Sequence, residues 1–117
     1  MKKLESLKKN SHFEIVLRNK VISNDLFSIY RAKNFIKRNL NDKKLYISFV
    51  MRKKTGNAVK RNRIKRKLKS SVQKLSKIDS AIDSDYTYII FGKEKVYSEQ
   101  SENLFKKMKK SFKEIKV

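Results

Sequence analysis

The alternation of hydrophobic and polar residues predicts strands in both halves of the chain. Residues 26–32 alternate between apolar and polar types, and residues 45–51 are rich in β-branched and aromatic types. We expect these segments to pair as an antiparallel hairpin, with the turn in the later part of residues 34–44. Residues 21–22 predict a very short strand, and residues 86–91 predict a strong one.

The longest helix is predicted over residues 58–76, directly after a break at Gly56 and Asn57. Its apolar positions recur at i, i+4, i+8 and i+11 and form one stripe, made of Ile64, Leu68, Val72 and Leu75. The stripe can pack on a sheet while the basic residues on the other sides of the helix stay exposed.

A shorter helix is predicted over residues 11–19. Ser11 is its expected N-cap, and Glu14 three residues later completes a capping box. Phe13 and Leu17 lie one turn apart on one face of this helix. The pattern leaves open whether these two side chains join the core or face a ligand.

A last helix is expected to be capped by Ser98 or Ser101 and to end near residue 113. Its apolar face consists of Leu104, Phe105, Met108 and Phe112. The order of helix, hairpin, helix, strand and helix is typical of an α+β fold with a small sheet covered by helices. Because 117 residues allow one core of this kind, we expect residues 1–117 to form a single domain.

The charge of the chain indicates which class of molecule it binds. The formal net charge is +21, from 32 basic and 11 acidic residues. Ten of the 18 residues in segment 52–69 are Lys or Arg, and residues 43–78 contain no acid. Such a one-sided charge run repels itself unless a polyanion neutralises it, and its apolar residues at helical spacing place it on a folded surface. The pattern therefore predicts a nucleic-acid partner.

The chain lacks the residues that several other functions would require. The chain has no Cys, which excludes disulfides, Cys-based zinc sites and thiol catalysis. No apolar run is long enough for a membrane span, and no apolar segment follows the basic N-terminus, so we expect a cytoplasmic protein without a membrane partner. We find no catalytic residues and no carboxylate cluster for a protein-held metal. If the chain takes part in phosphodiester cleavage, another molecule must supply the metals.

Groups suited to RNA are abundant. Arg binds two phosphate oxygens with its planar fork, and Asn57 and Asn62 can bond phosphate, 2′-OH or base edges. Gly56 allows close backbone approach at the start of a helix. Five aromatic residues offer faces on which bases could stack, although core packing is the alternative for most of them, and we expect two or three to face a ligand: Phe13, Phe27, Tyr30, Tyr46 and Phe49.

Residues 53–66 read KKTGNAVKRNRIKR, which resembles the RNR motif of the bacterial ribonuclease P protein family. The motif is long and specific. Leu7, Lys8, Lys9 and Phe13 are similar to the start of that family's N-terminal helix, and the resemblance covers nearly the whole chain. It implies a two-layer α-β sandwich in the order αβββαβα, related to a ribosomal-protein domain, with a left-handed βαβ crossover.

The resemblance also implies a function. The family's members are small basic subunits of ribonuclease P, an endonuclease that removes the 5′ leader from precursor tRNA. A catalytic RNA holds Mg²⁺ and performs the hydrolysis, while the protein binds that RNA and grips the single-stranded leader in a cleft between the sheet and the first helix. The expected partners are therefore the catalytic RNA and precursor tRNA, with no obligatory protein partner.

The family's binding positions carry over to two groups of residues. The leader cleft corresponds to Phe13, Leu17 and Tyr30. The surface for the catalytic RNA corresponds to Arg52, Lys53, Lys54, Gly56, Asn57, Arg61, Asn62, Arg63, Lys65, Arg66 and Lys69.

This chain departs from the family pattern at three places. Leu17 replaces a frequent aromatic, Arg52 replaces a small polar residue, and residues 48–50 are bulkier than usual, so we expect a reshaped cleft floor.

Three other functions are weighed against this one. An rRNA-binding ribosomal or assembly protein would share the charge, but its affinity for RNA would not depend on the length of a 5′ leader. A self-sufficient protein nuclease would need clustered carboxylates around a metal. A nucleoid DNA binder would prefer duplex DNA and gives no reason for the GNAVKRNRIKR pattern.

Overall fold

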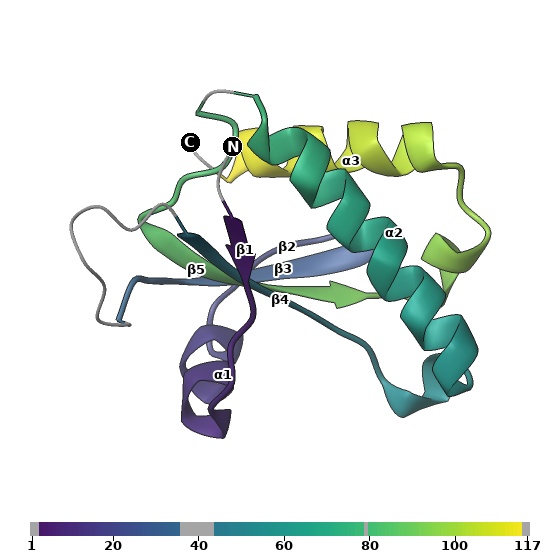
Figure 1. The fold of residues 1–117 in the computed structure, drawn as a ribbon, viewed down its shortest axis with the longest axis horizontal. Helices are drawn as coiled ribbons and strands as arrows, with labels where there is room; N and C mark the ends of the chain where they lie inside the picture. Colours follow the sequence, from purple (N-terminus) through teal and green to yellow (C-terminus); the bar gives the residue numbers. More distant parts are fainter. Residues whose placement is uncertain (1–2, 36–43, 79, 116–117) are drawn as a thin grey trace.

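The computed structural model describes residues 3–35, 44–78 and 80–115, which form a mixed five-stranded sheet with helices on both faces. One helix lies alone on one face, and the other two cover the opposite face (Figure 1). The elements in chain order are β1 (Lys3–Glu5), α1 (Asn10–Leu17), β2 (Lys20–Ser23), β3 (Phe27–Lys33), β4 (Lys44–Val50), the 3-10 helix η1 (Lys53–Thr55), α2 (Ala58–Ser76), β5 (Tyr86–Gly92), the 3-10 helix η2 (Glu94–Tyr97) and α3 (Ser101–Glu114). The α+β fold and the αβββαβα order are confirmed, with the additional strand β1 in front.

Strand β5 occupies the middle of the sheet, whose order is β1-β4-β5-β3-β2. It pairs antiparallel with β3 and parallel with β4, so the predicted antiparallel hairpin of β3 and β4 is wrong. The reason is burial: Thr87, Tyr88, Ile89 and Ile90 are buried in succession, so both faces of β5 are covered. Such a strand belongs at the centre of a sheet. The predicted turn falls mainly on residues 36–43, which lie outside the described residues.

The parallel pair of β4 and β5 is connected through α2, which makes a βαβ unit. Its left-handed sense stays an expectation from the resemblance. Strand β1 was not predicted, because three residues carry too little periodicity. It pairs parallel with β4 at the sheet edge, and the following Leu7 donates its backbone N–H to Ser48 Oγ at 2.8 Å.

Helix α2 has the predicted bounds, and all four residues of its apolar stripe are fully buried. Its N-cap is Asn57, whose side-chain oxygen accepts from the Lys60 amide at 2.9 Å. The helix lies very close to the sheet at Gly92, where an added Cβ would be 2.7 Å from Leu68 Cδ1. Cap, stripe and close approach together fix the direction in which the basic residues of α2 point.

The predicted caps of the two other helices are wrong. Helix α1 begins one residue earlier than expected, with Lys9 at the N-cap and no side-chain cap bond; the Lys9 carbonyl accepts from His12 and Phe13. Ser11 therefore lies inside the helix. Helix α3 has Gln100 at its N-cap, also without a side-chain cap bond, so Ser101 is its first residue.

The two faces of the sheet hold separate hydrophobic clusters. The large cluster joins the sheet to α2 and α3, and the small cluster joins it to α1 through buried Leu7, Val16 and Ile89. None of the described helices is long and apolar enough to span a membrane.

Candidate RNA-binding surfaces

Helix α2 presents an exposed basic strip on the side away from the sheet. We call these residues the α2 strip: Asn62, Arg63, Lys65, Arg66 and Lys69, all exposed. Within the described part of the chain, the acid ion-paired to segment 52–69 is Glu94, which binds Lys60 at 2.7 Å. Among the described residues, no acid is therefore ion-paired to the strip itself.

The loop before α2 adds three exposed basic side chains, Arg52, Lys53 and Lys54. Gly56 has a φ of +152°, which favours glycine, and a Cβ there would also displace the Lys60 side chain, whose Cδ would be 2.6 Å away. Gly56 and Asn57 thus have structural roles as turn and cap. Their contact with RNA stays a prediction.

Three basic residues of α2 are held against the protein. Lys60 lies over the Tyr97 ring at 5.1 Å, in addition to its ion pair with Glu94. Lys67 donates to the backbone carbonyls of Tyr97 and Glu99. Arg61 is half-buried, and among the described side chains its Nε is buried without a hydrogen-bond partner. Arg61 was predicted as an RNA contact, and its position is less open than the α2 strip.

Sequence reasoning missed the part played by η2. The Tyr97 ring also lies under Arg63, at 5.4 Å from the guanidinium carbon, so one exposed aromatic residue supports two cations. An aromatic residue in the polar stretch after β5 was the available signal. The ion pair to Lys60 lowers the pKa of Glu94, chiefly through the hydrogen bond.

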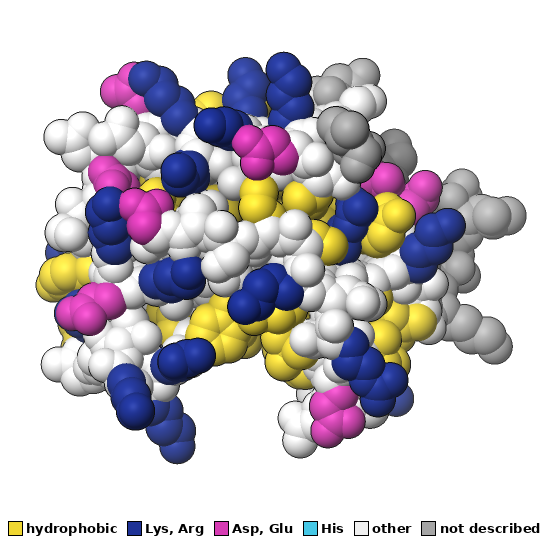
Figure 2. Space-filling view, turned by 180° about the vertical axis from the view of Figure 1, so that it is seen from behind, with side chains coloured by type: hydrophobic (Ala, Val, Ile, Leu, Met, Phe, Trp, Pro, Cys, Tyr) yellow, Lys and Arg dark blue, Asp and Glu magenta, His cyan; other side chains and the backbone are white. Residues whose placement is uncertain are grey.

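A hollow of about 370 Å³ opens at one end of the sheet, and its walls come from β2, β3, β5, the loop before α2 and the start of η2, where Glu94 is its one acid among the described residues. Tyr30 lies in it, with Lys20 Nζ 5.6 Å from the ring centre and the Phe91 ring 6.5 Å away. Arg52 lines the same hollow. Figure 2 shows hydrophobic side chains at the bottom of a notch in the surface, with Lys and Arg on both sides.

The other predicted aromatic residues divide between the two faces of the sheet. Phe13, Tyr30 and Tyr46 are half-buried in the small cluster on the α1 face. Phe27 and Phe49 are buried under α2 and α3, so they cannot stack on a base without unfolding. Phe49 therefore does not line the α1 face, whereas Val50 packs in the small cluster there, and the reshaping of the cleft floor expected from residues 48–50 stays a prediction.

Leu17 is 39% exposed and lies outside both clusters, because Val16 takes the buried position on α1. It remains available to a ligand at the end of the helix. Its place in the leader cleft stays a prediction, as do those of Phe13 and Tyr30.

Residues 1–116 match the family model described as Ribonuclease P. The chain belongs to the ribonuclease P protein family. It is 34% identical to the ribonuclease P protein component of Bacillus cereus strain AH187, over 95% of this chain and 94% of the relative. The corresponding protein of Mesomycoplasma hyopneumoniae strain 7448 is 29% identical over 99% and 96%.

The fold is similar to that of known ribonuclease P proteins. The Staphylococcus aureus RNase P protein has a TM-score of 0.73 at 23% identity, over 96% of this chain and 95% of that one. The Thermotoga maritima RNase P protein has a TM-score of 0.72 at 16% identity, over 94% and 96%. The chain is therefore a ribonuclease P protein subunit, part of a tRNA-processing ribonuclease with an RNA partner.

This ribonuclease P protein offers two surfaces of different chemistry. Helix α2, which carries the α2 strip, lies above the sheet in Figure 1, and helix α1, which packs on the small cluster, lies below it. Among the described residues, no three His, Asp or Glu side chains come close enough to hold a metal ion.

Proposed function

We propose that the chain binds the catalytic RNA of ribonuclease P through the α2 strip and the loop before it, and holds the single-stranded 5′ leader of precursor tRNA against the α1 face of the sheet. The basic residues release counterions from RNA, which supplies affinity without sequence preference. The observation that carries this proposal is the separation of an acid-free cationic strip from a half-buried aromatic hollow.

The hollow has the groups that a single strand requires. A base can stack on the Tyr30 ring while the neighbouring ammonium of Lys20 meets a phosphate, and Arg52 offers a second phosphate contact at the rim. Phe91 supports the Tyr30 ring from the side. The role of these residues is to orient the leader, which fixes where the scissile phosphate lies relative to the RNA.

We assign Mg²⁺ and the hydrolysis to the catalytic RNA, because the described carboxylates are scattered or ion-paired. The protein then contributes affinity and positioning, and it needs no further protein partner for this task. The site of action is the cytoplasm.

The deciding experiment is cleavage of precursor tRNA in Mg²⁺ with catalytic RNA alone, protein alone and both together, at low and near-physiological salt. We expect the pair to cleave the 5′ leader at near-physiological salt and the protein alone to be inactive. If the protein fails to stimulate the RNA, an rRNA-binding role becomes the better description. Cleavage by the protein alone would place an active site in this chain.

The leader contact is tested by Tyr30→Ala, with Tyr30→Phe as the control that keeps the ring. Stacking on an aromatic side chain contributes roughly 1–3 kcal/mol per base, so Tyr30→Ala should weaken holoenzyme binding of leader-bearing tRNA by about 5- to 150-fold. Binding of mature tRNA should not change, and Tyr30→Phe should bind as the original protein does. Equal losses for tRNA with and without the leader would remove Tyr30 from the cleft.

A further inference from the structure

A groove of about 340 Å³ runs between α2 and the start of α3, on the side of the sheet opposite the leader hollow. Helix α2 lines it with four basic side chains, Arg63, Arg66, Lys67 and Lys74. The remaining walls are serines, among them Ser70 on α2 and Ser101 on α3, and no carboxylate takes part. Cations together with hydroxyl donors make a binding environment for phosphate.

The charges in this groove are crowded, and no carboxylate lines it; Glu99, which lies outside the lining, offsets the charge of Lys67 only in part. The ammonium of Lys67 donates to the carbonyls of Tyr97 and Glu99, which hold it in place without cancelling its charge. Burial, and secondly the neighbouring Arg63, lowers the pKa of Lys67. A bound anion would relieve this repulsion.

The groove is continuous with the α2 strip, because Arg63 and Arg66 belong to both. This continuity identifies one source of phosphate. We propose that the groove is a second phosphate-binding site for the same catalytic RNA, so that the RNA backbone leaves the α2 strip and passes between α2 and α3 along Lys74, Ser70 and Ser101. The proposal rests on the function proposed above and extends its surface beyond the RNR-like segment.

Lys74 and Lys113 form a matched pair for the test. Each is an exposed lysine in the last turn of its helix, Lys74 on α2 and Lys113 on α3, and only Lys74 lines the groove. Replacement by Ala removes the same charge and the same favourable interaction with a helix C-terminus in both. A difference in RNA binding between the two variants therefore reports on the groove and not on helix stability.

We expect Lys74→Ala to weaken binding of the catalytic RNA and to reduce the slope of log affinity against log salt by roughly 0.7–0.9. Lys113→Ala should leave the slope unchanged. If the two variants behave alike, the groove does not bind RNA. If Arg63→Ala lowers the slope and Lys74→Ala does not, the α2 strip stands and the groove proposal fails alone. If the original protein does not bind the catalytic RNA, both proposals fail.

Crosslinking tests which RNA supplies the phosphates in the groove. The chain has no Cys, so a photo-crosslinker attached to the Ser70→Cys variant is placed at that one position. In the holoenzyme with precursor tRNA bound, we expect crosslinks to the catalytic RNA. Crosslinks to the tRNA alone would overturn the assignment of the groove to the catalytic RNA. The absence of crosslinks to either RNA would overturn the site.

Discussion

Helices α2 and α3 pack on the same side of the sheet and are both rich in lysine, yet they carry their charge differently. Helix α2 has eight basic residues and no acid in 19 residues, whereas α3 has five lysines and two glutamates in 14. Those glutamates are placed one turn from a lysine: Glu102 lies 3.5 Å from Lys106, and Glu114 lies 4.0 Å from Lys110. Helix α3 neutralises part of its own charge, and the outer strip of α2 does not.

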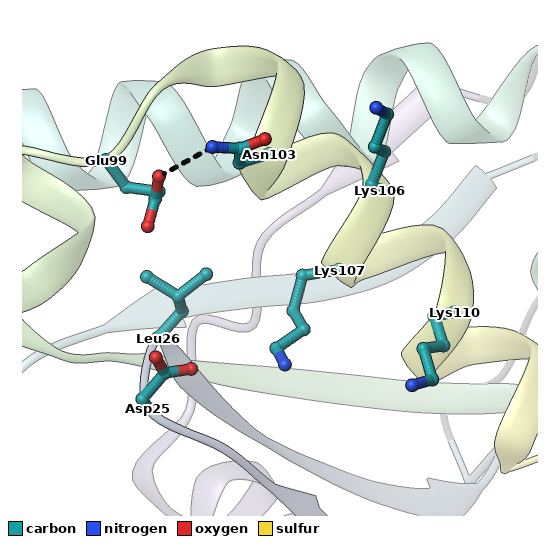
Figure 3. Close-up of a pocket in the computed structure, with 7 residues that line it drawn as sticks. All are labelled: Asp25, Leu26, Glu99, Asn103, Lys106, Lys107 and Lys110. Carbon is teal, nitrogen blue, oxygen red and sulfur yellow. Dashed lines mark hydrogen bonds between the residues drawn. The ribbon is translucent and has the colours of Figure 1, made fainter.

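The hollows beside the two helices repeat this difference. The groove between α2 and α3 has cationic and hydroxyl walls, whereas the hollow between α3 and the β2–β3 turn includes the acids Asp25 and Glu99 (Figure 3). Figure 3 shows Asp25 and Glu99 on the same hollow as Lys107 and Lys110. Net charge alone would make both helices RNA-binding surfaces. The placement of the acids favours α2 for that role.

The largest expected effect is the loss of charge from α2. Arg63→Ala combined with Arg66→Ala should weaken binding of the catalytic RNA by about 3 kcal/mol or more, a factor of roughly 10² or greater, because each charged hydrogen bond contributes about 1.5–3 kcal/mol. The salt slope should fall by about 1.4–1.8 for two lost phosphate contacts. Equilibrium binding across a salt series measures both quantities.

The control removes two exposed lysines from α3, by Lys109→Ala combined with Lys113→Ala. This variant loses the same charge but should keep the salt slope. Comparable losses in the two double variants would mean that RNA responds to net charge, and the distinction between the helices would be wrong.

The sequence predicted α2 fully because its signals are local. Asn57 caps the helix through the amide of Lys60, and the four-residue stripe fixes the buried face, so the exposed basic positions follow by geometry. The candidate RNA residues of the α2 strip could therefore be named without coordinates.

The sheet order could not be predicted in this way, because it depends on which strand becomes covered on both faces. The run of residues 86–91 identified a strand, but local pattern does not place β5 between β3 and β4. For the same reason, the sequence could not separate Tyr30, on the α1 face, from Phe27 and Phe49, on the other. The contact of Tyr97 with Arg63 joins residues far apart in the chain, so the sequence could mark Tyr97 as unusual but could not name its partner.

Substitutions at the N-caps of α2 and α3 should have an intermediate effect, on the free energy of unfolding. Helix α2 has a side-chain cap and α3 has none, so Asn57→Ala should lower the free energy of unfolding by about 1 kcal/mol, whereas Gln100→Ala should change it by less than about 0.5 kcal/mol. Urea denaturation measures both. Similar losses for the two variants would show that the Asn57 cap contributes nothing particular to α2.

Asn57→Ser separates the cap from a contact with RNA. Serine also accepts from the helix amide, so this variant should restore stability. If its affinity for the catalytic RNA is restored as well, Asn57 acts only as a cap; if affinity stays low, the amide group of Asn57 binds RNA directly.

The smallest expected effect comes from making each helix more cationic. Glu94→Gln releases Lys60 on α2, whereas Glu102→Gln combined with Glu114→Gln releases two lysines on α3. These ion pairs are exposed and screened by water, so none of these changes should alter stability measurably. We expect Glu94→Gln to raise affinity for the catalytic RNA by less than about tenfold, with a slightly steeper salt slope.

The α3 double variant should raise binding of the catalytic RNA and of an unrelated RNA by the same small factor, because its lysines do not lie beside a particular RNA surface. The α3 double variant adds two positive net charges, whereas Glu94→Gln adds one. If RNA responded to net charge alone, the α3 variant would therefore gain more affinity than Glu94→Gln. If the α3 variant gains more affinity for the catalytic RNA than Glu94→Gln does, and gains none for the unrelated RNA, then α3 also contacts that RNA. Its glutamates would then weaken that contact, and α3 would have to be counted with α2 as part of the interface.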